Sequence, residues 1–117
     1  IAQAKYVVVV CSILGKVTNL YEKQGEIYAR QQAGAAIENF LLKIMDLKLS
    51  SCWVGYFSEN NIKELLKIPE DVRVEAVLPI GYEFEKSRKR TKIELENILF
   101  FDKYGNRQMK KRESIEV

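Results

Sequence analysis

The hydrophobic pattern changes its period along the first half of the chain. Residues 5–12 are apolar without polar alternation, which predicts a β-strand buried on both faces. Residues 15–25 are polar and end in glycine, which predicts a loop with room for one helical turn. Over residues 26–47 the apolar positions recur at helical spacing, which predicts a long helix with a wide apolar stripe. The stripe consists of Ile27, Ala33, Ala36, Ile37, Phe40, Leu41, Ile44 and Met45.

The middle of the chain reads as a strand, a turn, a helix and a second strand. Residues 50–57 predict a short strand and a glycine turn. Ser58 is a suitable N-cap for a helix over residues 59–67, which Pro69 ends. Residues 72–80 are almost wholly apolar and predict an inner strand of a sheet.

The last third of the chain has weaker patterns. Residues 83–92 predict a charged loop, and residues 93–101 predict one helical turn followed by an extended piece. Residues 102–105 predict a turn. The basic tail that begins at Arg107 is predicted to be helical or without regular structure.

Composition narrows the classes of protein. The chain has 117 residues, of which 47% are hydrophobic, so it is one domain or part of one and can bury a core. Its 19 basic and 16 acidic residues are well mixed, and the net charge of +3 does not favour a nucleic-acid partner. No apolar run approaches the length that spans a bilayer, so no membrane association is expected.

The two cysteines and the absence of histidine narrow the possible chemistry. The chain contains no histidine, which excludes a His-based triad or His-ligated metal site within it. Cys11 and Cys52 lie in apolar strand-like runs and are predicted to be buried, reduced thiols in a cytoplasmic protein. Cys52 has no visible base beside it and is predicted to be inert.

Five motifs occur in a fixed order along the chain. They are AGAAIENFLL at 33–42, LKLSSCWVGYF at 47–57, IKELLKIPEDV at 62–72, LPIGY at 78–82 and RKR at 88–90. In this order and spacing they closely resemble the second half of the nitroreductase family of FMN-dependent oxidoreductases. The resemblance covers most of residues 4–100.

The resemblance implies a fold, an assembly and a domain division. The expected fold is α+β and nitroreductase-like, a partial domain with a central, mostly antiparallel sheet flanked by helices. Residues 1–105 would form the core and residues 106–117 a basic C-terminal tail. The family is homodimeric, with flavin at the subunit interface. Its N-terminal arginine-rich segment and the following flavin-contacting loop have no counterpart here, and Lys48 stands where the family often has glycine.

Gly55 is the first candidate site residue. The resemblance places its main-chain N–H near N5 of the flavin ring, with Val54 and Tyr56 beside it. A glycine allows this approach because it has no Cβ. From the local sequence alone, a simple turn between Val54 and Ser58 is the better explanation, because lone glycines mostly occupy turns. The extended resemblance reverses that preference.

Two arginines are the second candidate. The resemblance makes Arg88 and Arg90 contacts for the FMN phosphate, and arginine binds phosphate oxygens in bidentate fashion. Spacing of two in an extended loop puts both side chains on one face. A solvated basic loop is the competing interpretation, and it is the usual one for a charge run. Lys86 and Lys89 are weaker candidates.

Some neighbouring residues have structural explanations that compete with functional ones. Trp53 and Tyr56 could line the substrate face of a flavin, but core packing is favoured for Trp53. Gly34 suggests close packing of the helix against another backbone. Glu38 and Asn39 interrupt the apolar helix and fit either a subunit interface or a solvated face.

The implied function is a redox reaction. A hydride would pass from NAD(P)H through FMN, by a ping-pong mechanism, to a nitroaromatic, a quinone or a similar small-molecule acceptor. No side chain is required as acid or base, so no catalytic side chain is predicted. The alternative is a truncated, non-catalytic nitroreductase-like module that acts in dimerisation or regulation. A nucleic-acid-binding domain based on the basic loop and tail is a weaker third interpretation.

Overall fold

The computed structural model describes residues 3–86 and 89–110 of the chain. The chain divides into two compact units, Ile1–Glu85 and Lys86–Val117. Among the described residues, the first unit contains a three-stranded sheet and two helices, and the second contains one short helix. The predicted α+β class is confirmed.

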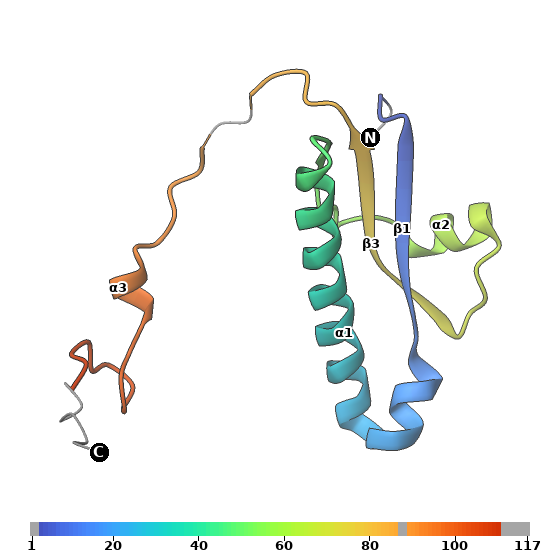
Figure 1. Cartoon of the computed structure of the whole chain (residues 1–117). Helices are drawn as coiled ribbons and strands as arrows, with labels where there is room; N and C mark the ends of the chain where they lie inside the picture. The colour runs from blue at the N-terminus through green and yellow to red at the C-terminus, as the bar shows by residue number, and fades with distance from the viewer. Residues whose placement is uncertain (1–2, 87–88, 111–117) are drawn as a thin grey trace, which may run out of the picture. The chain divides into compact units, whose positions relative to one another are not determined.

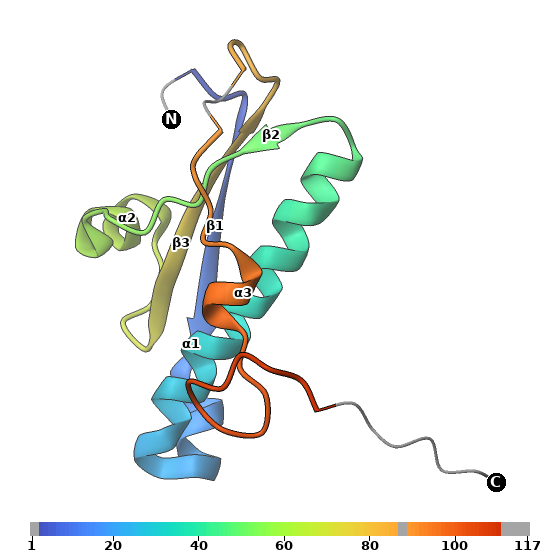
Figure 2. The same cartoon turned by 90° about the vertical axis from the view of Figure 1, so that its left-hand side faces the viewer.

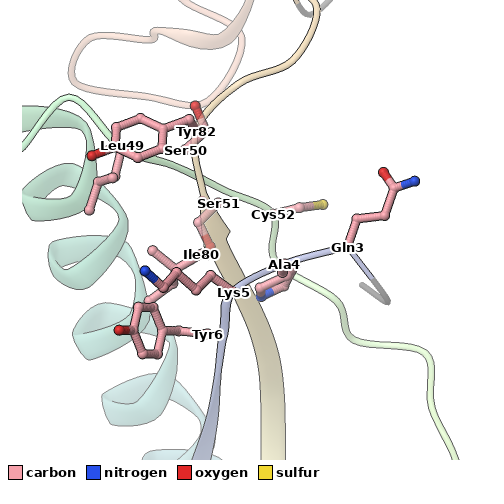
Figure 3. Close-up of a pocket in the computed structure, with 12 residues that line it drawn as sticks. Gln3, Ala4, Lys5, Tyr6, Leu49, Ser50, Ser51, Cys52, Ile80 and Tyr82 are labelled. Carbon is pink, nitrogen blue, oxygen red and sulfur yellow. The ribbon is translucent and has the colours of Figure 1, made fainter.

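The sheet is built around its longest strand. β3 (Val72–Gly81) lies between β1 (Tyr6–Ile13) and β2 (Ser50–Ser51), and both pairings are antiparallel. The prediction of an inner strand over residues 72–80 is therefore confirmed. The register places Tyr6 opposite Ile80 and Ser50 opposite Gly81, so the start of β1 and the whole of β2 meet at the C-terminal end of β3 (Figure 3).

Strand β1 is less buried than the sequence predicts. None of its residues is fully buried, and Tyr6 is 64% exposed, so the expectation of two buried faces is wrong. The physical reason is its position at the edge of the sheet in the described unit. The long helix α1 covers only one of the two faces of the sheet (Figures 1 and 2).

Helix α1 begins earlier than predicted. It runs over Leu14–Asp46, so the helix expected over residues 26–47 is confirmed, whereas the loop expected over residues 15–25 is wrong. Glu22 has φ 49° and ψ −127° and breaks the helix into two segments, which Figure 1 shows as a bend. Although α1 has 33 residues, no helix in the described ranges combines the length and apolar character of a membrane span.

The bend explains a glycine that the sequence marked only as a loop end. Gly25 is buried where the first helical segment folds back onto the second. A Cβ built on Gly25 would lie 2.6 Å from the carbonyl oxygen of Val17 and 2.7 Å from the Cα of Thr18. Because both atoms belong to the backbone, the contact leaves no room for a side chain at this position.

The core of the first unit is small. Ile37 of α1 packs with Ala76 and Leu78 of β3, and partly buried Val8, Val10 and Leu41 surround them. The buried stripe on α1 is narrower than predicted, because Ile27, Phe40 and Met45 are 49%, 37% and 69% exposed. Part of the apolar face of α1 therefore has no partner within the described residues.

Helix α2 covers the opposite face of the sheet. It spans Glu59–Leu66, close to the predicted residues 59–67, and Figures 1 and 2 agree in placing it across the sheet from α1. Ser58 occupies the N-cap position as predicted, but its side chain makes no capping hydrogen bond. The helix ends at Lys67, which adopts the left-handed conformation two residues before Pro69.

The thiol predictions are wrong in one respect. Cys11 and Cys52 are both free, but both are exposed rather than buried. Cys11 lies on the edge strand β1, and Cys52 follows the short strand β2 at the end of the sheet. Partial desolvation, with the charges of Glu59 and Glu75, raises the pKa of the Cys11 thiol and makes it a poor nucleophile.

The second unit holds one turn of helix, α3 (Leu95–Ile98), as expected for residues 93–101. A turn follows, in which Asp102 and Gly105 have positive φ. Asn106 closes it: its side-chain amide donates to the carbonyl of Phe101 at 3.0 Å. Residues 107–110 form no helix, and 111–117 lie outside the described residues. The predicted boundary between a core over residues 1–105 and a tail over 106–117 stays a prediction.

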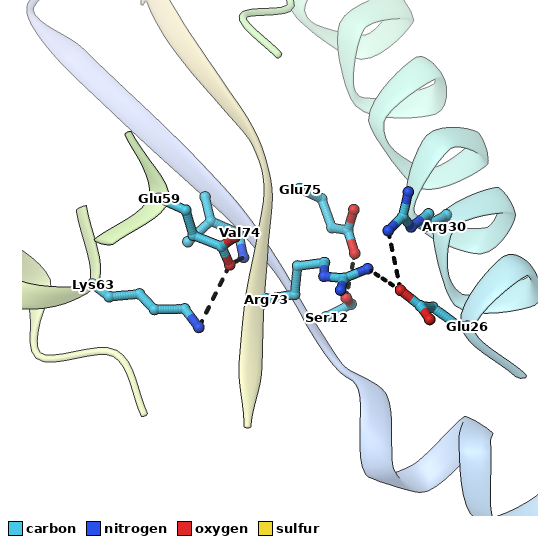
Figure 4. A network of polar contacts seen from close by, with 8 residues as sticks. All are labelled: Ser12, Glu26, Arg30, Glu59, Lys63, Arg73, Val74 and Glu75. Atoms are coloured by element: carbon cyan, nitrogen blue, oxygen red, sulfur yellow. Dashed lines mark hydrogen bonds and ion pairs between the residues drawn. The ribbon is translucent and has the colours of Figure 1, made fainter. Parts of the chain in front are cut away.

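A polar network joins α1 to the sheet. The Glu26 carboxylate accepts a hydrogen bond from Arg73 of β3 at 2.7 Å and one from Arg30 of α1 at 3.0 Å (Figure 4). The hydrogen bond from Arg73, then that from Arg30, lowers the pKa of the Glu26 carboxyl. This network adds a charged contact to the apolar contacts between the two elements.

The close approach at Gly25 gives the first prediction. Gly25→Ala should lower the free energy of unfolding by about 1–3 kcal/mol, because the new methyl group must displace backbone atoms. Gly15→Ala is the matched control. It lies in the same helix with nothing within 4 Å of its Cβ, and should be neutral or stabilising by about 0.5–1 kcal/mol. Urea unfolding of both variants measures the difference. Equal effects would mean that the fold-back at Gly25 does not form.

The Glu26 network gives a pH prediction. A carboxyl whose pKa is lowered by folding contributes stability above its unfolded pKa of about 4.3, and this contribution disappears as the pH falls through the lower folded value. Glu26→Gln should therefore lower the urea midpoint at neutral pH, and the difference from wild type should shrink below about pH 4. Glu38→Gln, on the exposed side of the same helix, is the control. A difference that persists in acid would contradict the ion-pair origin.

Candidate functional site

The Gly55 turn joins β2 to α2 and is attached to β3 at its start. The backbone of Val54 pairs with Val77 in both directions, with N···O distances of 3.1 Å and 3.0 Å. Val54 is partly buried by this pairing, whereas Gly55 is exposed and Tyr56 is 99% exposed. The three predicted ring-facing residues therefore lie on one exposed stretch of chain whose first residue is fixed to the sheet.

The conformation of Gly55 does not itself require glycine. The φ angle of Gly55 is not in the left-handed region. Among the described glycines, it is Gly105 that has a φ angle in that region. A Cβ added to Gly55 would meet nothing within 4 Å, and no described residue accepts a hydrogen bond from its N–H. Neither backbone strain nor packing within this unit explains the glycine.

The first unit has a cavity of about 610 Å³. Its lining includes residues that precede the Gly55 turn in the sequence, but not the turn itself. The cavity lies at the end of the sheet where the start of β1, the strand β2 and the end of β3 meet (Figure 3). Its polar lining includes Lys5, Ser50 and Cys52. The hydroxyl of Ser51, also in the lining, is inaccessible to solvent and has no hydrogen-bond partner among the described residues.

The sequence did not predict this cavity. Its remaining lining residues are Gln3, Ala4, Tyr6, Leu49, Pro79, Ile80, Gly81 and Tyr82. They come from three separate stretches that only the antiparallel register brings together. No local sequence motif encodes the register of the strands. These lining residues could therefore be found only from the pairing of the strands.

Trp53 is less buried than core packing would require. Its side chain is 43% exposed and lies against Gly34 of α1, where an added Cβ would be 3.8 Å from the Cη2 atom of the indole. That distance is an ordinary contact, so the unit itself does not require glycine at position 34. Glu38 and Asn39, on the same helix, are exposed. The side of α1 that faces away from the sheet is therefore partly polar and partly apolar.

The predicted phosphate contacts belong to another part of the chain than the Gly55 turn. Arg88 lies outside the described residues. Arg90 is exposed and belongs to the second unit, whereas Gly55 belongs to the first. Their roles stay predictions.

The far end of the Gly55 turn is also attached to β3, through a carboxylate that the sequence did not single out. Glu59, the first residue of α2, accepts a hydrogen bond from the backbone N–H of Val74 at 3.0 Å. Lys63 Nζ lies 3.5 Å from the same carboxylate oxygen (Figure 4). The hydrogen bond from Val74 is the largest cause that lowers the pKa of the Glu59 carboxyl, and the charge of Lys63 adds to it.

Comparison with known proteins identifies the family. The family model described as the nitroreductase family matches residues 1–82. A Methanocaldococcus jannaschii protein named as a nitroreductase is 31% identical over 85 residues, which cover 73% of this chain and 42% of that protein.

Solved structures show the same fold. The crystal structure of a nitroreductase family protein from Clostridium novyi NT has a TM-score of 0.62 at 27% identity, and covers 88% of this chain and 53% of that one. An FMN-dependent nitroreductase from Clostridium difficile R20291 has a TM-score of 0.68 at 21% identity, and covers 86% of this chain and 59% of that one. The chain thus spans about half the length of these relatives, and by its match over residues 1–82 it belongs to the nitroreductase family.

Proposed function

We propose that the protein is an FMN-dependent oxidoreductase that takes a hydride from NAD(P)H and reduces a nitroaromatic, a quinone or a similar small acceptor. The observation that carries the proposal is the open main chain at Gly55, whose N–H has no acceptor among the described residues and which has no steric reason there to be glycine. Bound FMN would supply the hydride chemistry, as flavins do in such enzymes.

The residues of the turn suit contact with a flat ring. Gly55 offers a main-chain donor that can reach the ring N5 without interference from a Cβ. The two hydrogen bonds between Val54 and Val77 fix the position of the residue that precedes this donor. Tyr56, almost fully exposed, is free to stack beside a ligand or a second chain. The family relative named as FMN-dependent supports this assignment.

The site is expected to need more than one copy of the chain. The apolar residues Ile27, Phe40, Leu42 and Met45 of α1 are all at least 37% exposed. Exposed apolar surface of this kind favours association with another protein surface. We therefore propose a homodimer whose interface includes α1 and which helps to enclose the flavin. A cytoplasmic location and the absence of a nucleic-acid partner stay predictions.

The same apolar face supports a second candidate function. A non-catalytic nitroreductase-like module that acts in dimerisation or regulation would also use the exposed side of α1. It differs from the first candidate in needing no flavin. The absorption spectrum of the full-length protein, before and after incubation with FMN and removal of free ligand, separates the two. Retained flavin bands support the oxidoreductase, and a protein that stays colourless supports the module.

The open space at Gly55 gives a prediction about flavin affinity. Gly55→Val should raise the dissociation constant for FMN by about tenfold or more, because the new side chain would occupy the space of the ring. The free energy of unfolding should change by less than about 0.5 kcal/mol, since a Cβ at this position meets nothing.

Gly15→Val is the matched control, because a Cβ at Gly15 in α1 also meets nothing within 4 Å. It should leave FMN affinity within about twofold of wild type. Fluorescence titration measures both variants. If Gly55→Val loses stability and affinity together, position 55 is only structural.

The phosphate assignment gives a separate prediction. Arg90→Ala should weaken FMN binding by about tenfold, because a charge-assisted hydrogen bond to the phosphate is lost. Riboflavin, which has no phosphate, should bind within about twofold of wild type. Lys89→Ala removes the same charge from the neighbouring position and should have a smaller effect on FMN. Equal weakening of FMN and riboflavin by Arg90→Ala would end the phosphate role.

A further inference from the structure

The Gly55 turn is held to β3 at both of its ends. At the first end, the backbone of Val54 pairs with Val77. At the second end, the carboxylate of Glu59 accepts the N–H of Val74, three residues further back along the same strand. Residues 55–58 lie between these two attachments. The turn therefore spans a fixed part of β3, with one attachment made by the backbone and the other by one side chain.

The second attachment lies at an irregularity in the sheet. The register between β1 and β3 shifts where Val10 opposes Ala76 and Cys11 opposes Val74, so Glu75 is the extra residue of a β-bulge. Bulges redirect the backbone groups of the strand in which they occur. Val74 is buried, and the described residues offer its N–H the Glu59 carboxylate as acceptor. A carboxylate is a strong acceptor for such a donor.

Lys63 strengthens this attachment. Its side chain is 12% exposed, its Nζ lies 3.5 Å from Glu59, and it donates to the carbonyl oxygen of Glu70 at 3.2 Å. Lys63 therefore joins the first turn of α2 to the loop that leads into β3. The side chain of the N-cap residue Ser58 makes no capping hydrogen bond, whereas the carboxylate of Glu59, the next residue, bonds to β3.

We propose that Glu59 is a positioning residue for the flavin site, because it fixes the direction in which the Gly55 main chain faces. This inference rests on the proposed function. Glu59 acts through the turn and does not itself touch the flavin. Loss of its carboxylate leaves Val54 as the hydrogen-bonded attachment of this turn to β3, so the Gly55 N–H samples a wider range of directions. A displaced donor weakens the contact with the ring, because hydrogen bonds depend steeply on angle.

The test measures the turn and the flavin separately. The first readout is the backbone amide ¹⁵N heteronuclear NOE of residues 55–58 in the flavin-free full-length protein. Glu59→Gln should lower these values, because the neutral amide is a weaker acceptor for Val74. Glu64→Gln, the same change at an exposed position of α2, should not lower them. The second readout is the dissociation constant for FMN and for riboflavin. Glu59→Gln should raise both by about fivefold, since both ligands share the ring.

Urea unfolding of each variant guards against a purely structural effect. If Glu59→Gln fails to fold, Glu59→Asp gives the same readouts, because it keeps the charge but shortens the reach by one methylene group. Turn mobility that matches wild type in the Glu59 variants overturns the attachment. A looser turn with unchanged flavin affinity overturns the positioning role. A wild-type protein that binds neither flavin ends the proposed function, and the NOE values still decide whether Glu59 holds the turn.

Discussion

The backbone of β3 is the constraint on which the rest of the first unit depends. β1 pairs along one of its edges, and β2 and Val54 pair along the other. Ala76 and Leu78 of β3 form the core with Ile37 of α1. Two further side chains, Arg73 and Glu75, make polar contacts with Glu26 and Ser12. Because each neighbouring element is tied to this strand, the position of the Gly55 turn follows from the position of β3.

The small core has a consequence for assembly. Apolar burial is the main favourable contribution to folding, and within the described residues only Ile37 and Leu78 are large side chains that are fully buried. Much of the apolar surface of α1 and β1 remains exposed. The chain spans about half the length of its family relatives. This offers a physical explanation for the exposed apolar surface, because that surface is available to another part of the protein or to a second copy. The dimer proposal depends on this exposed surface of α1, whereas the flavin proposal depends on the open main chain at Gly55.

Local sequence predicted the elements better than it predicted their environment. The helix over residues 26–47, the helix over 59–67 and the inner strand over 72–80 follow from periodicity and capping, and the structure confirms them. The helical start at residue 14 was missed because polar residues and Gly25 resemble a loop, whereas Gly25 in fact allows two helical segments to touch. The exposure of Cys11 and Tyr6 depends on strand order, which no local pattern encodes. The sequence did not indicate a role for Glu59, because its hydrogen-bond partner is a backbone N–H at a bulge in the sheet.

The amide resonance of Gly55 offers the most direct measurement. ¹H–¹⁵N spectra of the full-length protein, recorded during titration with FMN, would report on the environment of this N–H. If a flavin ring lies against the Gly55 main chain, the Gly55 resonance should move strongly as FMN is added, whereas that of Gly15 in the first turn of α1 should not. FMN that binds while the Gly55 resonance stays in place would contradict the account.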